Sequence, residues 1–271
     1  VVRFKNPNVE ITFNDEIRGD VTFDTTELGD FVIARNTTDP LYHLTVVVDD
    51  IDMGITHVIR GEDHISNTPR QILILEALGA TRPTYAHLPL ILNDDRSKMS
   101  KRKNPVDVAQ YIKDGFLPEA LINFLALLGW NPGTDEELFT RDELVERFSL
   151  DQVQKHGAVY DEVKLRWFNK EYLNKLDDAA FAEGVRSFFT KETLDALEKS
   201  GRFEKLIPEL RERIDVYGDI RTMEEAGEFT YFIEAPTPEK EQLLWKKDPE
   251  PGAAKECLEG ALQLLETLQE E

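Results

Sequence analysis

The fold class is decided by residues 57–92, which read HVIRGEDHISNTPRQILILEALGATRPTYAHLPLIL. Residues 57–61 form a short apolar run that ends in glycine and predicts a buried strand. Pro69 suits the first turn of a helix, and Gly79 suits the position just past its end. Residues 85–92 predict a second apolar strand. A strand, a helix and a strand within this length predict a βαβ unit, and hence a parallel sheet.

The segments on either side of this unit have different apolar periods. Apolar and polar residues alternate over 9–13, so the chain up to about residue 44 predicts a small β-rich element. After about residue 109 the apolar spacing is helical. Pro118 suits the first turn of one helix, and residues 140–143 carry a capping-box pattern that begins another.

Length and composition limit the classes of protein to consider. A chain of 271 residues suits two or three domains. Cys257 is the single cysteine, so the chain can form neither a disulfide framework nor a Cys-rich zinc site. No apolar run is long enough to cross a bilayer.

The net charge has to be read locally. A formal charge of −21 argues against nucleic acid binding by the chain as a whole. Residues 96–103 nevertheless hold five basic residues and no acidic one. The acidic residues of 234–250 are interpreted as a solvated face, and residues 234–251, which hold four prolines, as a linker.

Two groups are expected at the ligand-binding edge of the parallel sheet, beyond the carboxyl ends of its strands. One is Arg60, and the other is the polar loop that follows Leu92. On that loop Lys98 and Lys101 lie three residues apart and can converge on a triphosphate. They would stabilise a leaving pyrophosphate electrostatically. The competing interpretation is a basic surface turn.

Residues 98–102, KMSKR, resemble the KMSKS-type signature of the class I aminoacyl-tRNA synthetases. Residues 57–71 resemble the segment between a catalytic strand and helix of the bacterial-type glutamyl-tRNA synthetases. Residues 85–90 resemble the strand that leads to their signature loop. The segments 115–121 and 164–169 resemble their stem-contact region. The resemblance covers about residues 1–235 and is most specific for 42–173.

The resemblance implies residues that bind glutamate. Arg60 resembles the arginine that pairs with the side-chain carboxylate of the substrate, and a guanidinium fork suits that group. Tyr42 resembles the tyrosine whose hydroxyl helps to hold the amino acid. The competing interpretations are a packing role for Tyr42, and an ion pair of Arg60 with Glu62 or Asp63.

The resemblance also implies residues that contact ATP or tRNA. Asp63 and His64, which follow the first strand, would contact ATP. The backbone groups of Leu90 and Ile91 would receive adenine. Lys98 and Lys101 of the loop would hold the phosphates. Arg211 and Arg213 resemble residues of an anticodon-facing helix. The competing interpretation of those two arginines is a salt-bridged helix face with Glu209 and Glu212.

Neither a catalytic role for His87 nor a metal site at His57 and His64 is expected. His87 lies inside the second apolar strand and is interpreted as a satisfied core or near-site histidine. A metal pair of His57 and His64 is disfavoured, because no cysteine lies nearby. No metal site is therefore expected within the chain.

The fold class implied by the resemblance is the α/β half of a Rossmann-type class I synthetase catalytic domain, followed by all-α tRNA-binding domains. Residues 1–44 would be a remnant of the acceptor-stem-binding insertion, and 45–108 the second half of the catalytic domain. Residues 109–175 would be a helical stem-contact domain. Residues 176–271 would be a helical anticodon-binding domain, incomplete at its C-terminus.

The implied function is that of a glutamate–tRNA ligase that uses L-glutamate, tRNA(Glu) and ATP with Mg²⁺. The parent protein is expected to be cytoplasmic and monomeric, without a membrane anchor. The family's other signature, His-x-Gly-His, is absent from this chain. We therefore expect an internal fragment that does not activate glutamate alone. The alternative is a non-catalytic tRNA-binding paralogue. A glutaminyl-tRNA synthetase relative is disfavoured, because the region after residue 109 is helical.

Overall fold

The computed structural model describes residues 1–99, 107–234 and 251–267. The strands are β1 (Val2–Phe4), β2 (Glu10–Asp15), β3 (Gly19–Asp24), β4 (Phe31–Asn36), β5 (Asp39–Pro40), β6 (His57–Gly61), β7 (Thr84–Leu88), β8 (Ile91–Leu92) and β9 (Ala158–Val159). The helices of the sheet-containing part are α1 (Tyr42–Asp52) and α2 (Thr68–Ala77), with the 3-10 helix η2 (Glu62–Asn67) between β6 and α2.

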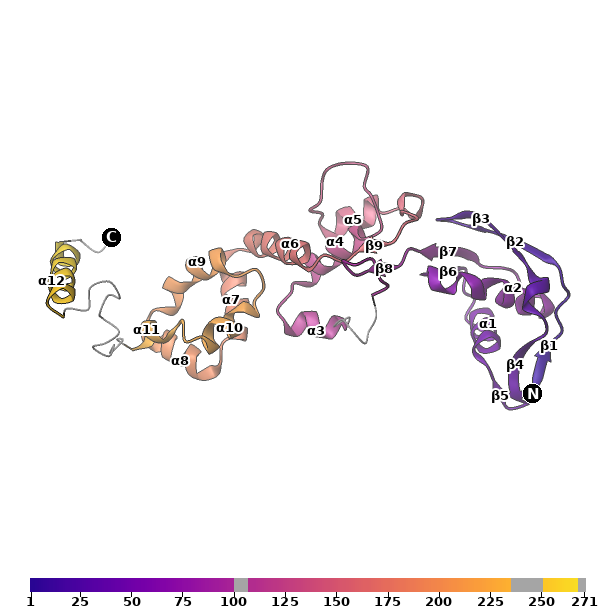
Figure 1. Cartoon of the computed structure of the whole chain (residues 1–271), viewed down its shortest axis with the longest axis horizontal. Helices are drawn as coiled ribbons and strands as arrows, with labels where there is room; N and C mark the ends of the chain where they lie inside the picture. The colour runs from indigo at the N-terminus through magenta and orange to yellow at the C-terminus, as the bar shows by residue number, and fades with distance from the viewer. Residues whose placement is uncertain (100–106, 235–250, 268–271) are drawn as a thin grey trace.

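The remaining helices follow residue 107. They are α3 (Val108–Lys113), α4 (Pro118–Leu127), α5 (Arg141–Arg147), α6 (Glu162–Lys175), α7 (Asp178–Phe188), α8 (Lys191–Lys199), α9 (Phe203–Arg213), α10 (Asp219–Glu225), α11 (Thr230–Ile233) and α12 (Pro251–Thr267). Within residues 1–234 the sheets that contain β1–β7 lie at one end, α7–α11 lie at the other, and α3–α6 lie between them (Figure 1).

The central sheet has the strand order β3-β2-β7-β6. β6 and β7 are parallel and joined through α2, which confirms the predicted βαβ unit. β2 is antiparallel to β3 and runs parallel to β7 at Asp15 and Tyr85. The predicted N-terminal strands therefore form, and one hairpin of them extends the α/β sheet.

The inward face of β2 explains how this hairpin is held. Ile11, Phe13 and Asp15 are buried, while the residues between them are exposed. The Phe13 ring meets the Tyr85 ring edge-on, at 5.5 Å between centroids. Burial of such alternating side chains under a helix is the main stabilising contribution to a sheet of this kind. Asp15 is the exception, since it brings a carboxylate to an apolar face.

Helix α2 packs on two partners. Ile72 and Leu73 belong to the core under the central sheet, whereas Ile74 and Leu75 pack against Val47 of α1. Gly79 follows the helix with φ of +72°, a left-handed conformation that favours glycine. The predicted helix end at this glycine is confirmed.

The second strand is shorter than predicted. The sequence predicts one strand over 85–92, but β7 ends at Leu88 and Pro89 follows. Proline has no N–H to donate to a sheet, so the ladder stops there. The chain then forms β8, which pairs with β9 instead of the central sheet. The prediction of a single strand is wrong for this reason.

The helical character predicted after about residue 109 is confirmed. Pro118 lies in the first turn of α4, and Thr140 and Glu143 form the capping box that begins α5. Leu165 and Phe168 of α6 are fully buried in a core that α4 shares. A second core, containing Ile17, Ala86, Trp130, Phe139, Leu144 and Val153, joins these helices to the central sheet.

A joint of buried polar contacts connects α3–α6 with α7–α11. The fully buried Asn169 accepts the N–H of Leu117 at 2.7 Å and donates to the carbonyl of Asp215 at 2.6 Å. The turn at Gly115 lies against Gly218, whose N–H donates to the carbonyl of Asp114 at 3.1 Å. These contacts between backbone segments fix the two sets of helices relative to each other.

The last described element is α12, a helix within the region predicted to be helical. Leu258, Leu262 and Leu265 of this helix are exposed. Most of the predicted linker, from residue 235 to 250, lies outside the described residues. Across the described part of the chain, no helix is both long enough and apolar enough to span a membrane.

Candidate active site

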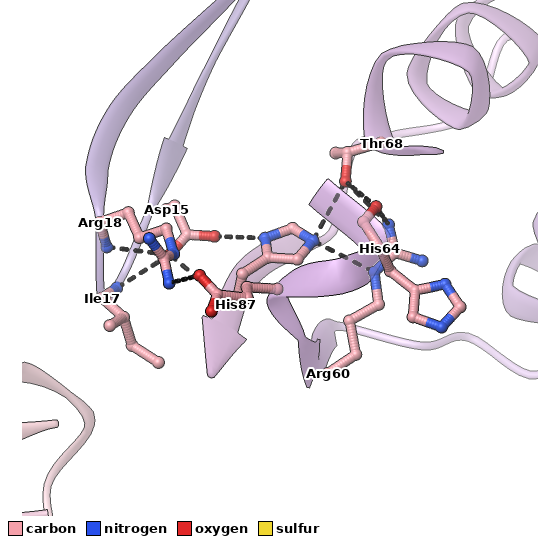
Figure 2. Close-up of polar contacts among 8 residues, drawn as sticks. Asp15, Ile17, Arg18, Arg60, His64, Thr68 and His87 are labelled. Carbon is pink, nitrogen blue, oxygen red and sulfur yellow. Dashed lines mark hydrogen bonds and ion pairs between the residues drawn. The ribbon is translucent and has the colours of Figure 1, made fainter. Parts of the chain in front are cut away.

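Arg60 lies at the carboxyl end of the parallel strands, where ligands are expected. It is the penultimate residue of β6, and the last residues of β6 and β7, Gly61 and Leu88, are paired. Its Nε donates to Nε2 of His87 at 3.2 Å, and its Nη2 donates to the Thr68 hydroxyl at 2.8 Å (Figure 2). The guanidinium is thus anchored by two uncharged groups.

The acidic neighbours of Arg60 bind elsewhere. Glu62 forms an ion pair with Arg18 and accepts the backbone N–H of Leu90 at 3.1 Å. Asp63 accepts from Lys98 at 2.7 Å. The interpretation in which Glu62 or Asp63 pairs with Arg60 is therefore wrong.

Burial lowers the pKa of the Arg60 guanidinium, and the nearby Tyr42, Tyr85 and Asp50 partly offset this effect. Within the described residues, Arg60 forms no ion pair with a carboxylate. The guanidinium is thus partly desolvated while its charge is not neutralised. This is a suitable state for binding a carboxylate from solution.

Tyr42 and His64 lie beside Arg60, as the resemblance implies. Tyr42 is the first residue of α1 and 49% exposed, and its ring centroid is 6.3 Å from that of His64. The carbonyl of His64 is 3.5 Å from Nη2 of Arg60. Tyr42 of α1 therefore meets Arg60 and His64, which both come from the segment 57–71.

A tight turn carries Lys98 to the same edge of the sheet. The N–H of Asn93 donates to the Ser97 carbonyl at 2.8 Å, and the N–H of Met99 donates to the Ile91 carbonyl at 3.0 Å. The Lys98 ammonium ends at Asp63, three residues after Arg60, and its hydrogen bond lowers the pKa of the Asp63 carboxyl. Lys101 lies outside the described residues.

The backbone groups expected to receive adenine have partners within the chain. The N–H of Leu90 donates to Glu62, and its carbonyl accepts from the N–H of Ala158 at 3.0 Å. Ile91 is exposed, and its carbonyl accepts from Met99. The roles of Leu90 and Ile91 remain predictions.

Sequence reasoning missed Asp15 and Thr68, and it interpreted His87 as a core or near-site histidine. All three side chains are buried, and Asp15 Oδ2 accepts from His87 Nδ1 at 2.6 Å. A signal for Asp15 was available, because it continues the inward positions of Ile11 and Phe13. A carboxylate at such a position requires a buried partner.

Burial and hydrogen bonding have opposite effects on the pKa of His87 and on that of Asp15. Burial lowers the pKa of His87, and the hydrogen bond that it donates to Asp15 does not fully offset this effect. Burial raises the pKa of Asp15, but hydrogen bonds from His87 and from backbone N–H groups outweigh it, so the net pKa is lowered. His87 is therefore neutral and Asp15 is ionised near pH 7.

Acid should destabilise the fold through His87. Below about pH 6.5 the unfolded chain binds a proton at this histidine that the folded chain does not, so stability falls as pH falls, by up to about 1.4 kcal/mol per pH unit. Urea unfolding between pH 7 and pH 5 measures the slope. His87→Gln should reduce it, whereas His57→Gln, at an exposed histidine, should not. Equal slopes in all three proteins would contradict the assignment.

The two arginines predicted to contact tRNA are engaged within the helical region. Arg211 donates to the carbonyls of Leu173 and Leu176 at 2.9 and 3.0 Å and lies 4.2 Å from the centroid of the Phe181 ring. Arg213 forms an ion pair with Glu228. The acidic partners are Asp178 for Arg211 and Glu228 for Arg213, not Glu209 and Glu212. The tRNA role of the two arginines remains a prediction.

No group of three or more His, Cys, Asp or Glu side chains in the described ranges could hold a metal ion. His57 instead shares a hydrogen bond with Thr56 at 2.9 Å, and His64 with Asn67 at 3.2 Å.

Comparison with known proteins assigns the family. Residues 1–167 match the model of the tRNA synthetases class I (E and Q), catalytic domain. The chain belongs to this family. The match covers the central sheet, Arg60, and the Lys98 loop, so the site lies within the catalytic domain of a class I synthetase.

The chain is similar to proteins named glutamate–tRNA ligase. The one from Carboxydothermus hydrogenoformans is 53% identical over 189 residues, which are 69% of this chain and 39% of that protein. The one from Thermobifida fusca is 42% identical over 97% of this chain and 54% of that protein. A crystal structure of the ligase from Elizabethkingia meningosepticum, in complex with its amino acid, matches with a TM-score of 0.76 at 32% identity. It aligns with 98% of this chain and 55% of that one. The chain thus spans about half, or less, of these class I synthetases.

Proposed function

We propose that this chain supplies the part of a glutamate–tRNA ligase that binds the side-chain carboxylate of glutamate and the phosphates of ATP. The observation that carries the proposal is the anchored Arg60 guanidinium, without a carboxylate partner among the described residues, at the strand end that Lys98 also reaches. The ligases to which the chain is similar support the same reading.

On the glutamate side, the contacts of Arg60 with His87, His64 and Thr68 use Nε and Nη2. The Tyr42 hydroxyl is a further hydrogen-bond partner of the guanidinium, and a substrate carboxylate would bind beside that hydroxyl. A fixed guanidinium fork distinguishes a carboxylate from the amide of glutamine, because an amide presents an N–H group and no net charge. Arg60 and Tyr42 would therefore select glutamate by its side chain.

On the ATP side, Lys98 would exchange Asp63 for phosphate oxygens, and Lys101 would join it. The α-carboxylate of glutamate attacks the α-phosphate of ATP, which gives the adenylate and releases pyrophosphate, and the acyl group then passes to the tRNA 3′ end. Ammonium groups stabilise the charge that develops on the leaving pyrophosphate. Asp63, His64, Leu90 and Ile91 would contribute to ATP binding, and Mg²⁺ would accompany ATP.

The helices after residue 107 are assigned to tRNA. Residues 109–175 would contact the stem and 176–271 the anticodon, with Arg211 and Arg213 at the anticodon face. Helix-presented arginines and aromatic rings suit recognition of unpaired bases. Residues 1–44 would belong to the acceptor-stem region, and we expect a cytoplasmic, monomeric parent protein.

The proposal is tested with the chain and with its reading frame extended upstream of Val1. The purified 271-residue chain should release no pyrophosphate from ATP with L-glutamate and tRNA(Glu), because it has no His-x-Gly-His. An extended frame that encodes this motif should give a protein that charges tRNA(Glu) with glutamate. Pyrophosphate release by the chain alone would contradict the first expectation. An upstream frame without the motif would favour the non-catalytic tRNA-binding paralogue.

A further inference from the structure

A buried carboxylate lies behind the arginine of the site. The Asp15 side chain is fully buried, and its Oδ1 accepts three backbone N–H groups: those of Ile17 at 3.1 Å, Arg18 at 3.0 Å and His87 at 3.2 Å. Its Oδ2 is 2.6 Å from Nδ1 of His87. Figure 2 shows the sequence of contacts from Asp15 through His87 to Arg60. The proposed substrate-binding roles do not use Asp15 or His87.

These contacts determine which ring nitrogen of His87 carries the proton. A guanidinium Nε–H can only donate, so Nε2 of His87, at 3.2 Å from it, has to accept. The imidazole proton is then on Nδ1, where it is donated to the Asp15 carboxylate. The Thr68 hydroxyl, which accepts from Arg60 Nη2, lies 3.1 Å from His87 Nε2 and 3.4 Å from the His64 carbonyl, and either of these can accept its proton. Every member of the network has a partner of the right kind.

We propose that Asp15 and His87 are positioning residues, which hold the Arg60 guanidinium in the orientation that accepts the side-chain carboxylate of glutamate. This inference rests on the proposed function of Arg60. Asp15 fixes the tautomer of His87, and the neutral ring of His87 then fixes Arg60.

The arrangement has a chemical advantage over a direct acid–arginine contact. A carboxylate in hydrogen-bonding contact with Arg60 would restrain the side chain, but it would also neutralise the guanidinium and compete with the substrate. A neutral imidazole and a hydroxyl restrain it without supplying a charge. The acid that stabilises the arrangement is one side chain further away, so the substrate carboxylate becomes the direct charged partner of Arg60.

Nuclear magnetic resonance of the ¹⁵N-labelled 271-residue chain tests the tautomer without a substitution. Long-range ¹H–¹⁵N correlation distinguishes protonated from unprotonated ring nitrogens, and His87→Gln identifies the signals of His87. We expect the proton on Nδ1, and a slowly exchanging Arg60 Nε–H. A proton on Nε2 would overturn the proposal, because it would face the Arg60 donor.

Asp15→Asn tests whether the Asp15 carboxylate sets the tautomer of His87. The three backbone N–H groups at Oδ1 require the amide oxygen of the new side chain to stay there, so its NH₂ group faces His87 Nδ1. Nδ1 then has to accept, the proton moves to Nε2, and Arg60 is displaced. We expect the Arg60 Nε–H to exchange at least about tenfold faster, as for the loss of one hydrogen bond to a charged group. Asp20→Asn, at an exposed aspartate of the same hairpin, is the matched control. Equal exchange in both variants would overturn the proposal.

Two substitutions of His87 separate orientation from packing, and they decide the matter if Asp15→Asn does not fold. The amide of Gln reaches the position of Nε2 and can accept from Arg60, whereas the shorter Asn amide reaches only the position of Nδ1. Slow Arg60 Nε–H exchange should be retained in His87→Gln and lost in His87→Asn. Equal exchange in the two variants would overturn the orienting role.

Titration with L-glutamate, with L-glutamine as the comparison, separates this inference from the proposed function. If L-glutamate shifts the Arg60 signals of the chain, Asp15→Asn should weaken binding about tenfold; unchanged affinity would overturn the inference. If L-glutamate shifts nothing, glutamate binding by this chain fails, and the tautomer and exchange results still decide whether Asp15 and His87 position Arg60.

Discussion

Replacing Arg60 by lysine is expected to lower kcat/KM for glutamate about a hundredfold, which corresponds to roughly 3 kcal/mol. A lysine ammonium retains the charge but loses the fork, and it cannot keep the contacts to His87 and Thr68 while it also binds a carboxylate. The measurement is tRNA charging by the protein with the extended reading frame, at varied glutamate concentrations. The KM for ATP should change little, because Arg60 is not assigned to the phosphates.

Arg35→Lys is the control for this substitution. Arg35 is an exposed arginine of β4 whose contact is an ion pair with Asp39 at 3.3 Å, and such a surface pair contributes little to stability. The KM for glutamate should be unchanged in this variant, because Arg35 is not assigned to the amino acid. An Arg60→Lys protein that uses glutamate as well as the Arg35→Lys protein would remove the basis for assigning the carboxylate to Arg60.

Gly115→Ala is expected to destabilise the helical part of the chain by about 4 kcal/mol or more, because strain and overlap combine. Gly115 has φ of +86°, which alanine rarely adopts. Its new Cβ would be 2.5 Å from the backbone nitrogen of Gly218 and 2.8 Å from Cβ of Tyr217. A backbone segment cannot move aside as a flexible side chain can, so the joint between α3–α6 and α7–α11 has to open.

Gly133→Ala separates the two contributions. Gly133 also has a left-handed backbone, with φ of +76°, but a Cβ there would meet nothing within 4 Å. Its substitution should cost only the conformational strain, about 1–2 kcal/mol. Chemical denaturation followed by tryptophan fluorescence compares the variants. Similar losses of stability would show that the Gly115–Gly218 contact adds nothing.

Local signals were sufficient for much of the catalytic half. The βαβ unit was predictable because its strands, its helix start at Pro69 and its helix end at Gly79 are encoded within thirty-six consecutive residues, 57–92. The positions of Arg60 and Lys98 at one edge of the sheet were predictable, because a strand end and a basic turn each have a local pattern. The resemblance added Tyr42 and His64, which the structure places beside Arg60.

Features that depend on distant partners were not predictable. Asp15 and His87 are 72 positions apart and meet because β2 lies beside β7. Helix α1 was not predicted either, since its centre, Val46, Val47 and Val48, has β-branched residues that favour strands. Packing of Val47 against α2 outweighs that local preference. In the same way, pairing of β8 with β9 depends on a segment that follows more than sixty residues later.

The pairing of β8 with β9 has a mechanical consequence. Arg60 belongs to the central sheet, but the turn that carries Lys98 is attached through β8 to a strand between α5 and α6. Pro89 separates the two attachments. Any rotation about this proline would change the distance between the group assigned to the amino acid and the group assigned to the nucleotide. Movement of the helices around β9 would then change the alignment of the two reactants, while Arg60 stays fixed relative to its own strand.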